Sequence, residues 1–375
     1  MTFLLAPNAM KGSLTAQQIA ALIQKSLRRK YPQSTIVSSP IADGGNGTLE
    51  CLMNALGGTV FAKEVTGPVS TVKVSARFGI TKNSVGIIES AEAIGLQHIT
   101  PSPETIAQST SHGVGELINE AMAKNCKEIW IGLGGSATND GGAGAARALG
   151  VQLFDDSGEE LKDGVMNLLR LNRITNKEYR TANVEIKLLS DVNNILLGEH
   201  GATYTFARQK GASEEQCPYL ESAVKNFADV TERHLGKEFR NIPGSGAAGG
   251  LGFGLLAFCN AQIVSGINFI LDAIGFDEKL RQCDAIITTE GMLDEQTLFG
   301  KGVAGITERA SRMNTPVHAF VGKIKGNKES LQKKLCLASL TQIAPDELST
   351  AQAMRDASWL LADAIFNHDF STPHS

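Results

Sequence analysis

Four segments of the chain combine glycine with polar side chains that could serve phosphate chemistry. They are ADGGNGT (42–48), GLGGSATNDGGAG (132–144), PGSGAAGGLGFG (243–254) and TTEGMLDEQTLFGKG (288–302). Glycine lets a backbone approach a phosphate closely, and carboxylates suit Mg²⁺ or the proton of a hydroxyl group. Each segment alone also fits a tight turn. Together they favour a phosphate and metal site.

The candidate binding residues in these segments are glycines and their polar neighbours. They are Asp43, Gly44, Gly45, Gly134, Gly135, Ser136, Asn139, Asp140, Gly246, Gly249, Gly250 and Glu290. Two further aspartates are candidates. Asp294 lies in the last of the four segments, and Asp191 follows the apolar run EIKLL. A carboxylate at the carboxyl end of a strand is well placed for catalysis, but a turn held by Asx hydrogen bonds explains Asp191 equally well.

Two lysines next to glycine could supply the cations that phosphoryl transfer requires. Lys11 lies between the predicted first strand and first helix, and Lys301 precedes the helix that follows Asp294. Both are predicted to reach phosphates at helix N-termini, with exposed loop lysines as the alternative.

A dinucleotide-binding fingerprint is the competing interpretation of one glycine segment. Gly132, Gly134 and Ala137 follow a predicted strand, and Asp155 follows the next apolar run, VQLF. This order is typical of NAD-dependent enzymes. A second match at 244–249 shows how easily a glycine-rich chain produces the pattern, so an NAD-dependent enzyme stays the lesser alternative.

Composition narrows the class of protein. The chain has 375 residues, a net charge of −4 and no long basic run, which argues against a nucleic-acid partner. Its length predicts two domains, or one domain with a large insertion. Six scattered cysteines predict reduced thiols and a cytoplasmic protein.

One uncharged stretch, residues 241–271, is long enough to cross a bilayer. It begins with Pro243 and closely spaced glycines, and it carries Asn260 and Gln262 centrally. We therefore predict a buried glycine loop and a core helix, and no membrane association. The apolar run at the N-terminus is too short for a signal peptide and predicts a strand.

Short apolar runs that end in glycine or an acid, each followed by a helical pattern, predict an α/β fold. The predicted strands are FLLAP, GIIESAE (86–92), EIWIGLGG (128–135), EIKLLSD (185–191), DAIITTE (284–290) and VHAFVGK (317–323). A capping box at Thr15 starts the first helix. Alternating β-branched residues between 59 and 89 predict hairpin strands at the start of a second domain.

Several of these segments, in order along the chain, resemble those of the type I bacterial glycerate kinase family. The matching segments are APNAMKGSLTA (6–16), PIADGGNGT (40–48), SHGVGELI (111–118), IGLGGSATNDGGAGAARALG (131–150), SDVNNILLGEHGATYTFARQKGA (190–212), GSGAAGGLGFGLLAF (244–258) and IITTEGMLDEQTLFGKG (286–302). The resemblance covers most of the chain.

The resemblance implies two different α/β domains with an interdomain cleft. One is a mostly parallel three-layer sheet domain, and the other is inserted into it. We expect residues 1–60 and 284–375 to form the first domain and residues 61–283 the inserted one. The family transfers the γ-phosphoryl group of ATP to glycerate with Mg²⁺, generally giving 2-phosphoglycerate.

The resemblance also implies roles for individual residues. Asp191, Asp294 and Lys11 are the expected catalytic residues, and the two aspartates are the expected Mg²⁺ ligands. The remaining candidates, including Glu290 and Lys301, are expected to bind the small hydroxy acid or the nucleotide. Both a monomer and a homodimer stay open.

Five positions depart from the family pattern: Ser190 and Ile195 differ from the usual residues, and three further departures remove a charge. Asn8 and Asn46 replace an aspartate and a glutamate, and Met292 replaces an arginine. Loss of two carboxylates weakens a Mg²⁺ site, and loss of arginine removes a bidentate grip on an anion. The alternative is therefore a catalytically weakened or substrate-shifted member that acts as a ligand-binding module.

Overall fold

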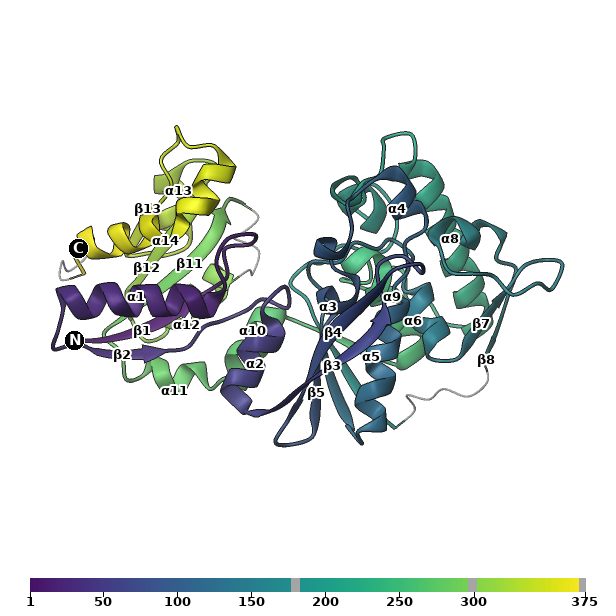
Figure 1. Cartoon of the computed structure of the whole chain (residues 1–375), viewed down its shortest axis with the longest axis horizontal. Coiled ribbons are helices and arrows are strands. Elements are labelled where there is room, and N and C mark those ends of the chain that lie inside the picture. The colour runs from purple at the N-terminus through teal and green to yellow at the C-terminus, as the bar shows by residue number, and fades with distance from the viewer. Residues whose placement is uncertain (177–182, 296–301, 371–375) are drawn as a thin grey trace. The chain divides into compact units, whose positions relative to one another are not determined.

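The computed structural model describes residues 1–176, 183–295 and 302–370, and Figure 1 labels its helices and strands. The chain divides into two compact units. Unit 1 comprises Met1–Asp43 and Ser265–Ser375, and unit 2 comprises Gly44–Val264. Both ends of the chain belong to unit 1, while unit 2 is one continuous segment.

Unit 1 is built on a five-stranded parallel sheet with the strand order β13-β12-β11-β1-β2. Its strands are β1 (Thr2–Pro7), β2 (Thr35–Ser38), β11 (Ala285–Leu293), β12 (Val317–Ile324) and β13 (Ser339–Gln342). Its helices are α1 (Ala16–Lys30), α10 (Gly266–Ala273), α11 (Phe276–Leu280), α12 (Gly302–Ser311), α13 (Lys328–Lys334) and α14 (Thr350–Asn367).

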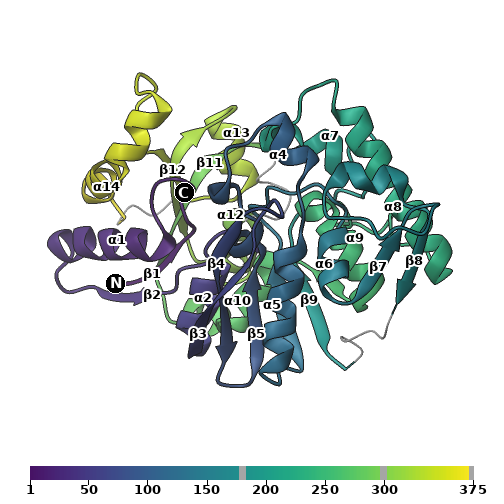
Figure 2. The ribbon, with the colours of Figure 1, turned by 45° about the vertical axis from the view of Figure 1, so that its right-hand side comes forward.

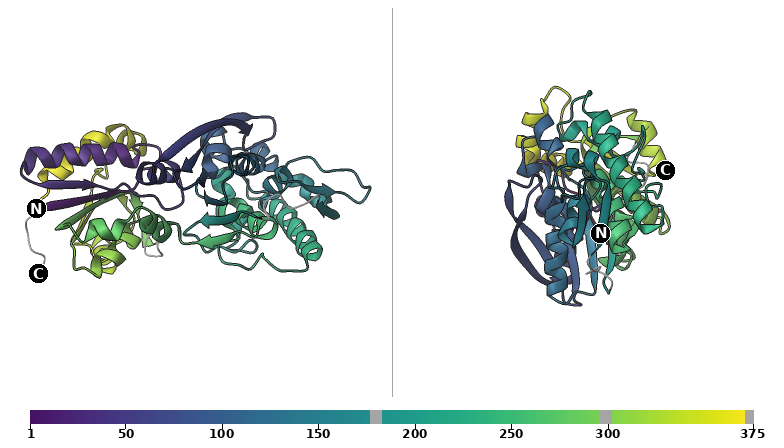
Figure 3. Two further views of the ribbon diagram at one scale, coloured as in Figure 1. Left: turned by 90° about the horizontal axis from the view of Figure 1, so that it is seen from below. Right: turned by 90° about the vertical axis from the view of Figure 1, so that its right-hand side faces the viewer.

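Helix α1 begins as its sequence predicts. The Thr15 side chain accepts a hydrogen bond from the Gln18 backbone, and the Gln18 side chain accepts one from the Thr15 backbone. Ile19, Ile23 and Leu27 are fully buried at helical spacing. They join a core cluster with residues of β1, β11 and α14. Helices α1 and α14 cover one face of the sheet, and the green helices α10 to α12 lie on the other (Figure 3).

Unit 2 contains a six-stranded sheet with the order β10-β9-β6-β5-β4-β3 and a two-stranded sheet, β7-β8. The strands are β3 (Gly58–Thr66), β4 (Lys73–Thr81), β5 (Val85–Glu89), β6 (Glu128–Gly132), β7 (Val151–Phe154), β8 (Arg173–Asn176), β9 (Glu185–Leu189) and β10 (Gln262–Val264). The α-helices are α2 (Thr48–Leu56), α3 (Ser90–Ile94), α4 (Pro103–Ala107), α5 (His112–Ala123), α6 (Ala143–Ala148), α7 (Ala202–Phe206), α8 (Cys217–Leu235) and α9 (Ala247–Cys259).

The large sheet of unit 2 is mixed. β5, β6, β9 and β10 are parallel, whereas β3 and β4 form an antiparallel hairpin that continues antiparallel into β5 (Figure 2). The predicted hairpin between 59 and 89 is therefore confirmed. Gly79 of β4 lies under α2, because a Cβ there would be 2.3 Å from the sulfur of Met53. Phe78, its neighbour on the opposite face, belongs to the core cluster that includes α5.

The uncharged stretch 241–271 folds as predicted into a glycine loop and a buried helix. Helix α9 is almost entirely buried. Ala248, Gly249 and Gly250 have left-handed backbone angles, which kink the start of this helix. Among the described residues, no helix combines the length and the apolar character that crossing a membrane would require.

The predicted α/β class with parallel sheets in two sheet-containing units is confirmed. The units change at Asp43/Gly44 and Val264/Ser265, whereas the sequence placed the domain boundaries after residues 60 and 283. The segments between these positions are α2, α10 and α11. Helix α2 packs on β4 and β5 of unit 2, and α10 packs on α12 of unit 1. These are tertiary contacts that local sequence patterns do not reveal.

Arg309 joins three helices of unit 1 and provides a stability test. Its guanidinium is 2.7 Å from Asp272 of α10, and it donates to Asp277 of α11 and to the Asn268 carbonyl, both at 3.0 Å. Arg309→Met should lower the free energy of unfolding by about 1–3 kcal/mol, since a buried cationic hub is lost. Chemical denaturation followed by circular dichroism measures the change.

Arg312→Met is the matched control, at the residue directly after the same helix. Arg312 is largely exposed and pairs with Glu308, one turn away. Such pairs contribute about 0.3–0.5 kcal/mol. Equal effects of the two substitutions would show that the Arg309 contacts do not stabilise this unit.

Candidate functional site

Three strands of unit 2 end at one edge of its sheet, because β5, β6 and β9 run parallel. Glu89, Gly132 and Leu189 are their last residues. The loop that precedes α2 also reaches this edge, where the Gly134 N–H donates to the Gly44 carbonyl at 2.9 Å. Loops far apart in the sequence are therefore neighbours within this unit.

Most predicted site residues belong to this edge of unit 2. They are Gly44, Gly45, Gly134, Gly135, Ser136, Asn139, Asp140, Asp191, Gly246, Gly249 and Gly250. Those in unit 1 are Lys11, Asp43, Glu290 and Asp294. Lys301 lies outside the described residues.

The glycines allow these loops to touch through their backbones. Gly44 has φ +88°, and a Cβ there would lie 2.4 Å from the Leu189 carbonyl oxygen. Gly249 has φ +68°, and its Cβ would lie 1.9 Å from the Thr138 carbonyl oxygen. Close approach is thus required at both positions, and the group approached is another loop. Approach to a phosphate stays a prediction for these glycines.

The 244–250 segment packs on the loop after β9. The Gly246 N–H donates to the Asn194 carbonyl at 2.9 Å, and the Asn194 side chain donates to the His200 carbonyl at 2.7 Å. Asp191 is half-buried at the start of this loop, two residues after β9 ends. Both contacts are made by Asn194, which therefore holds the loop three residues after Asp191.

Asp140 is a buried carboxylate surrounded by donors. It accepts hydrogen bonds from the Ser111 N–H and hydroxyl at 2.7 and 2.8 Å, and from the N–H groups of Gly142 and Gly144 at 3.1 and 2.9 Å. Burial raises the pKa of Asp140, and these hydrogen bonds oppose the rise. Its geometry orders the turn into α6, and its predicted contact with a ligand stays a prediction.

Ser136 and Asn139 are also fixed by buried contacts. The Lys210 ammonium donates to the Ser136 hydroxyl at 3.1 Å, and the Asn139 amide donates to the Thr203 hydroxyl at 3.2 Å. Lys210 is only 3% exposed. Sequence reasoning did not single it out, although it lies in the family-like segment 190–212.

In unit 1, two predicted positions meet where β1 and β11 run side by side. The Asn8 amide donates to the Glu290 carboxylate at 3.3 Å, and Asn8 is only 5% exposed. A Cβ on Gly302, at the start of α12, would lie 3.0 Å from the Asn8 amide nitrogen. The helix start, the amide and the carboxylate therefore form one cluster.

Lys11 and Asp294 follow the carboxyl ends of the same two parallel strands. Lys11 is exposed in the turn after β1, and Asp294 is half-buried directly after β11. The backbone nitrogen of Lys11 lies 3.7 Å from the position of a Cβ on Gly291. This edge of unit 1 thus presents a cation and a carboxylate from adjacent loops.

The two other departures from the family pattern that remove a charge have different surroundings. Met292 is half exposed on β11, and its partner in register on β12 is the exposed Lys323. Asn46 lies over Gly135, since a Cβ on that glycine would be 2.4 Å from the Asn46 side-chain oxygen.

The dinucleotide-binding alternative is not supported by the arrangement of strands. That layout requires the strand before the acid to lie beside the strand before the glycine loop. Here β7, which precedes Asp155, pairs antiparallel with β8 in a separate sheet from β6. The Asp155 carboxylate accepts hydrogen bonds from Ser157 and Glu159 and pairs with Arg170. Asp155 is therefore a turn residue.

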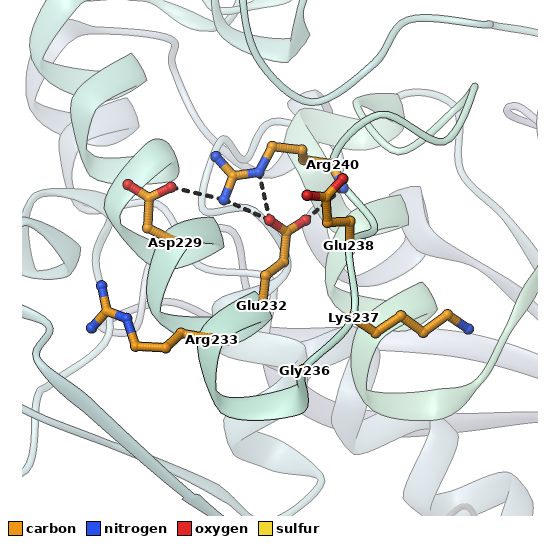
Figure 4. A pocket seen from close by; sticks show the side chains of 7 residues that line it. All are labelled: Asp229, Glu232, Arg233, Gly236, Lys237, Glu238 and Arg240. Carbon is orange, nitrogen blue, oxygen red and sulfur yellow. Dashed lines mark hydrogen bonds and ion pairs between the residues drawn. The ribbon is translucent and has the colours of Figure 1, made fainter.

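A charged surface hollow lies at the C-terminal end of α8 (Figure 4). Its Arg240 guanidinium lies between two carboxylates, 2.7 Å from Asp229 and 2.6 Å from Glu232. The other lining residues are Arg233, Gly236, Lys237 and Glu238. None of the predicted site residues that the structure describes lines it. We interpret it as an ion-pair network that holds the segment around Arg240 against α8.

Glu89 is a second residue that sequence reasoning missed. It is 5% exposed, and its carboxylate accepts from the N–H groups of Gly47 and Leu49 at 3.0 and 3.2 Å. Burial raises its pKa to about 7, with the two N–H groups and Arg77 opposing and Glu92 assisting. It therefore ties the end of β5 to the start of α2.

This titration predicts a pH-dependent stability. The folded state binds more protons than the unfolded state between pH 4.5 and about 7, so stability falls as pH rises through this window. The loss is roughly 3 kcal/mol. Glu89→Gln should remove this slope. Denaturant unfolding at pH 5, 6, 7 and 8, followed through Trp130 of β6, measures it.

Glu64→Gln is the control, because Glu64 is exposed on β3 of the same sheet. It should keep the wild-type slope. A Glu89→Gln protein with an unchanged slope would show that another group causes the pH dependence.

Comparisons with known proteins identify relatives over almost the whole chain. The model of the glycerate kinase family matches residues 3–368. Glycerate kinase of Halalkalibacterium halodurans is 36% identical over 98% of this chain and 97% of that protein. Glycerate 2-kinase of Escherichia coli is 38% identical over 86% of each chain.

A solved structure extends the similarity to the whole fold. The crystal structure described as glycerate kinase 2 from Salmonella typhimurium LT2 has a TM-score of 0.81 and 34% sequence identity. The match covers 98% of this chain and 96% of that one. With the family model matching almost every residue, this chain belongs to the glycerate kinase family.

Proposed function

We propose that the chain is a glycerate kinase that transfers the γ-phosphoryl group of ATP to a hydroxyl group of D-glycerate, giving 2-phosphoglycerate. The 38% identity to the Escherichia coli glycerate 2-kinase is the observation that carries this proposal. Kinases of this family use an ATP-type donor and an alcohol acceptor. We propose three details: that glycerate is the substrate, that its 2-hydroxyl group is phosphorylated, and that the enzyme acts in the cytoplasm.

The base in this proposal is a carboxylate, either Asp191 or Asp294. Each is half-buried and lies within two residues of the end of a parallel strand, where a substrate hydroxyl can approach. Positioning and charge neutralisation supply most of the catalysis in phosphoryl transfer. The carboxylate therefore orients the hydroxyl and accepts its proton at a side-chain oxygen.

Cations in the proposal neutralise the charge of the transferred group. Lys11 is exposed at the edge of unit 1 and can contact phosphate oxygens. Lys301 is proposed for the same task. The loops 134–139 and 244–250 of unit 2 are proposed to bind anionic groups through their backbone.

Mg²⁺ fits the donor chemistry of these loops. Among the described residues, no three His, Cys, Asp or Glu side chains gather as ligands of one metal ion. Mg²⁺ at kinase sites usually takes one or two carboxylates, with phosphates and water filling its other positions. Asp191 and Asp294 each offer such a carboxylate. When bound, Mg²⁺ neutralises charge on the phosphates.

A ligand-binding module is the second candidate function. It is favoured by Asn8, Asn46 and Met292, which lack the charges of the family pattern. In this case the chain binds glycerate or a nucleotide without turnover.

The decisive assay supplies purified protein with Mg²⁺, ATP and D-glycerate. We expect phosphoglycerate to form with a turnover of roughly 1–100 per second, and phosphorus NMR to identify the 2-phosphate. A reaction without D-glycerate controls for ATP hydrolysis. If D-glycerate and related hydroxy acids all give no product, the kinase proposal is wrong.

An inactive protein would be compared with the triple variant Asn8→Asp, Asn46→Glu, Met292→Arg. A steep rise in activity from near zero would support the ligand-binding module. High activity of the natural protein would exclude that module.

The two candidate bases are separated by substitution. Asp191→Asn or Asp294→Asn should lower kcat by a factor of about 10²–10⁴, depending on which carboxylate accepts the proton. Unchanged circular dichroism would show that the fold is intact. Asp156→Asn, at an exposed turn position of unit 2, is the control and should keep full activity. Full activity in both variants would leave the two aspartates as turn residues.

A further inference from the structure

The ammonium group of Lys210 is buried beneath one of the glycine loops of unit 2. Lys210 ends a short 3-10 helix, Arg208–Lys210, and is 3% exposed. Its Nζ donates to the Ser136 hydroxyl at 3.1 Å and to the Thr138 carbonyl at 2.8 Å. One cation therefore ties two positions of a loop that lies more than seventy residues earlier in the chain.

The middle of this loop carries polar atoms that are not otherwise engaged. Thr138 and Asn139 are both 0% exposed. Within the described part of the chain, the Thr138 hydroxyl and the Asn139 side-chain oxygen have no hydrogen-bond partner. Other bonds hold the loop on either side of these atoms: the Ala137 N–H donates to the Ile94 carbonyl at 2.7 Å, the Asn139 N–H to the Ser109 hydroxyl at 3.1 Å, and the Gly141 N–H to the Gly249 carbonyl at 3.0 Å. The lysine is the charged one among these supports.

Burying an ammonium group is a costly way to hold two uncharged acceptors. Burial lowers the pKa of Lys210 to about 7, and the charge of Asp140 opposes the shift. A neutral amide could make the same two hydrogen bonds at a lower desolvation cost. At pH values below this pKa, the ammonium adds positive charge beneath the loop, where the low dielectric screens it weakly.

We propose that Lys210 is a positioning residue that holds the Ser136–Asn139 loop in an anion-binding shape and makes this loop electropositive toward a carboxylate or phosphate. It does not contact the ligand itself, because it is buried under the loop. The identity of the anion as glycerate or ATP rests on the proposed function.

The test compares Lys210→Met with Lys225→Met. Lys225 is exposed on α8 of the same unit and pairs with Asp229 at 2.6 Å. We expect Lys210→Met to raise KM for ATP or for D-glycerate about tenfold, with kcat per folded molecule changed less than about threefold. Lys225→Met should match wild type. A purely structural role would instead lower the folded fraction and leave both KM values unchanged.

Ser136→Ala keeps the test decisive if Lys210→Met fails to fold. It removes one acceptor and leaves the bond to the Thr138 carbonyl in place. It should raise the same KM by a smaller factor. Unchanged KM values in Ser136→Ala, or in a folded Lys210→Met protein, overturn the proposal.

Calorimetry separates this inference from the proposed function. If wild type turns over D-glycerate and the variants keep its KM values, only the Lys210 inference fails. If wild type is inactive on D-glycerate, the proposed function fails. In that case the Kd of Mg-ATP tests the loop directly: a weaker Kd in Lys210→Met supports the inference, and an equal Kd refutes it.

Discussion

Backbone contact between glycine loops is the constraint on which the candidate site of unit 2 depends. Gly44 and Gly249 each lie where a side chain would collide with the carbonyl group of another loop. The loops after β5, β6 and β9 share one edge of the sheet because these strands are parallel. Glycine lets the segments before α2 and at the start of α9 interlock with them there. The resulting surface is built from backbone groups, which do not change rotamer. A platform of this kind is suited to holding an anion in a fixed position.

Three buried ionisable groups support this platform from below. Asp140 orders the turn into α6, Glu89 holds the start of α2, and Lys210 holds the loop between them. Each charge costs free energy to bury, and each is satisfied by backbone N–H groups or loop acceptors. Burial raises the pKa values of Asp140 and Glu89 and lowers that of Lys210, which favours the neutral form of each group. Burying these groups therefore lowers the stability of unit 2, but it fixes the positions of the loops at this edge of the sheet.

The sequence was sufficient for β1, β5, β6, β9, β11 and β12 because their signal is local, whereas β2, β10 and β13 were not predicted. In EIWIG and EIKLL the alternate residues Ile129 and Ile131, and Ile186 and Leu188, are buried, and these runs became β6 and β9. Lys210 and Glu89 could not be found in this way, since their partners are distant in the chain. A lysine next to glycine looks like an exposed loop residue. The place of α2 in unit 2 was equally hidden, because it depends on Met53 fitting over Gly79.

In unit 1, the neutral Asn8 changes the charge balance beside Glu290. Its amide donates to Glu290, so the pair forms a hydrogen bond with one negative charge at most. An aspartate at this position would bring two carboxylates into contact, and they would repel each other or share a proton. Asparagine thus removes a charge without leaving Glu290 unpaired. A less negative strand end opposes an incoming anion less strongly, which favours binding of an acidic substrate even where it weakens the grip on a metal ion.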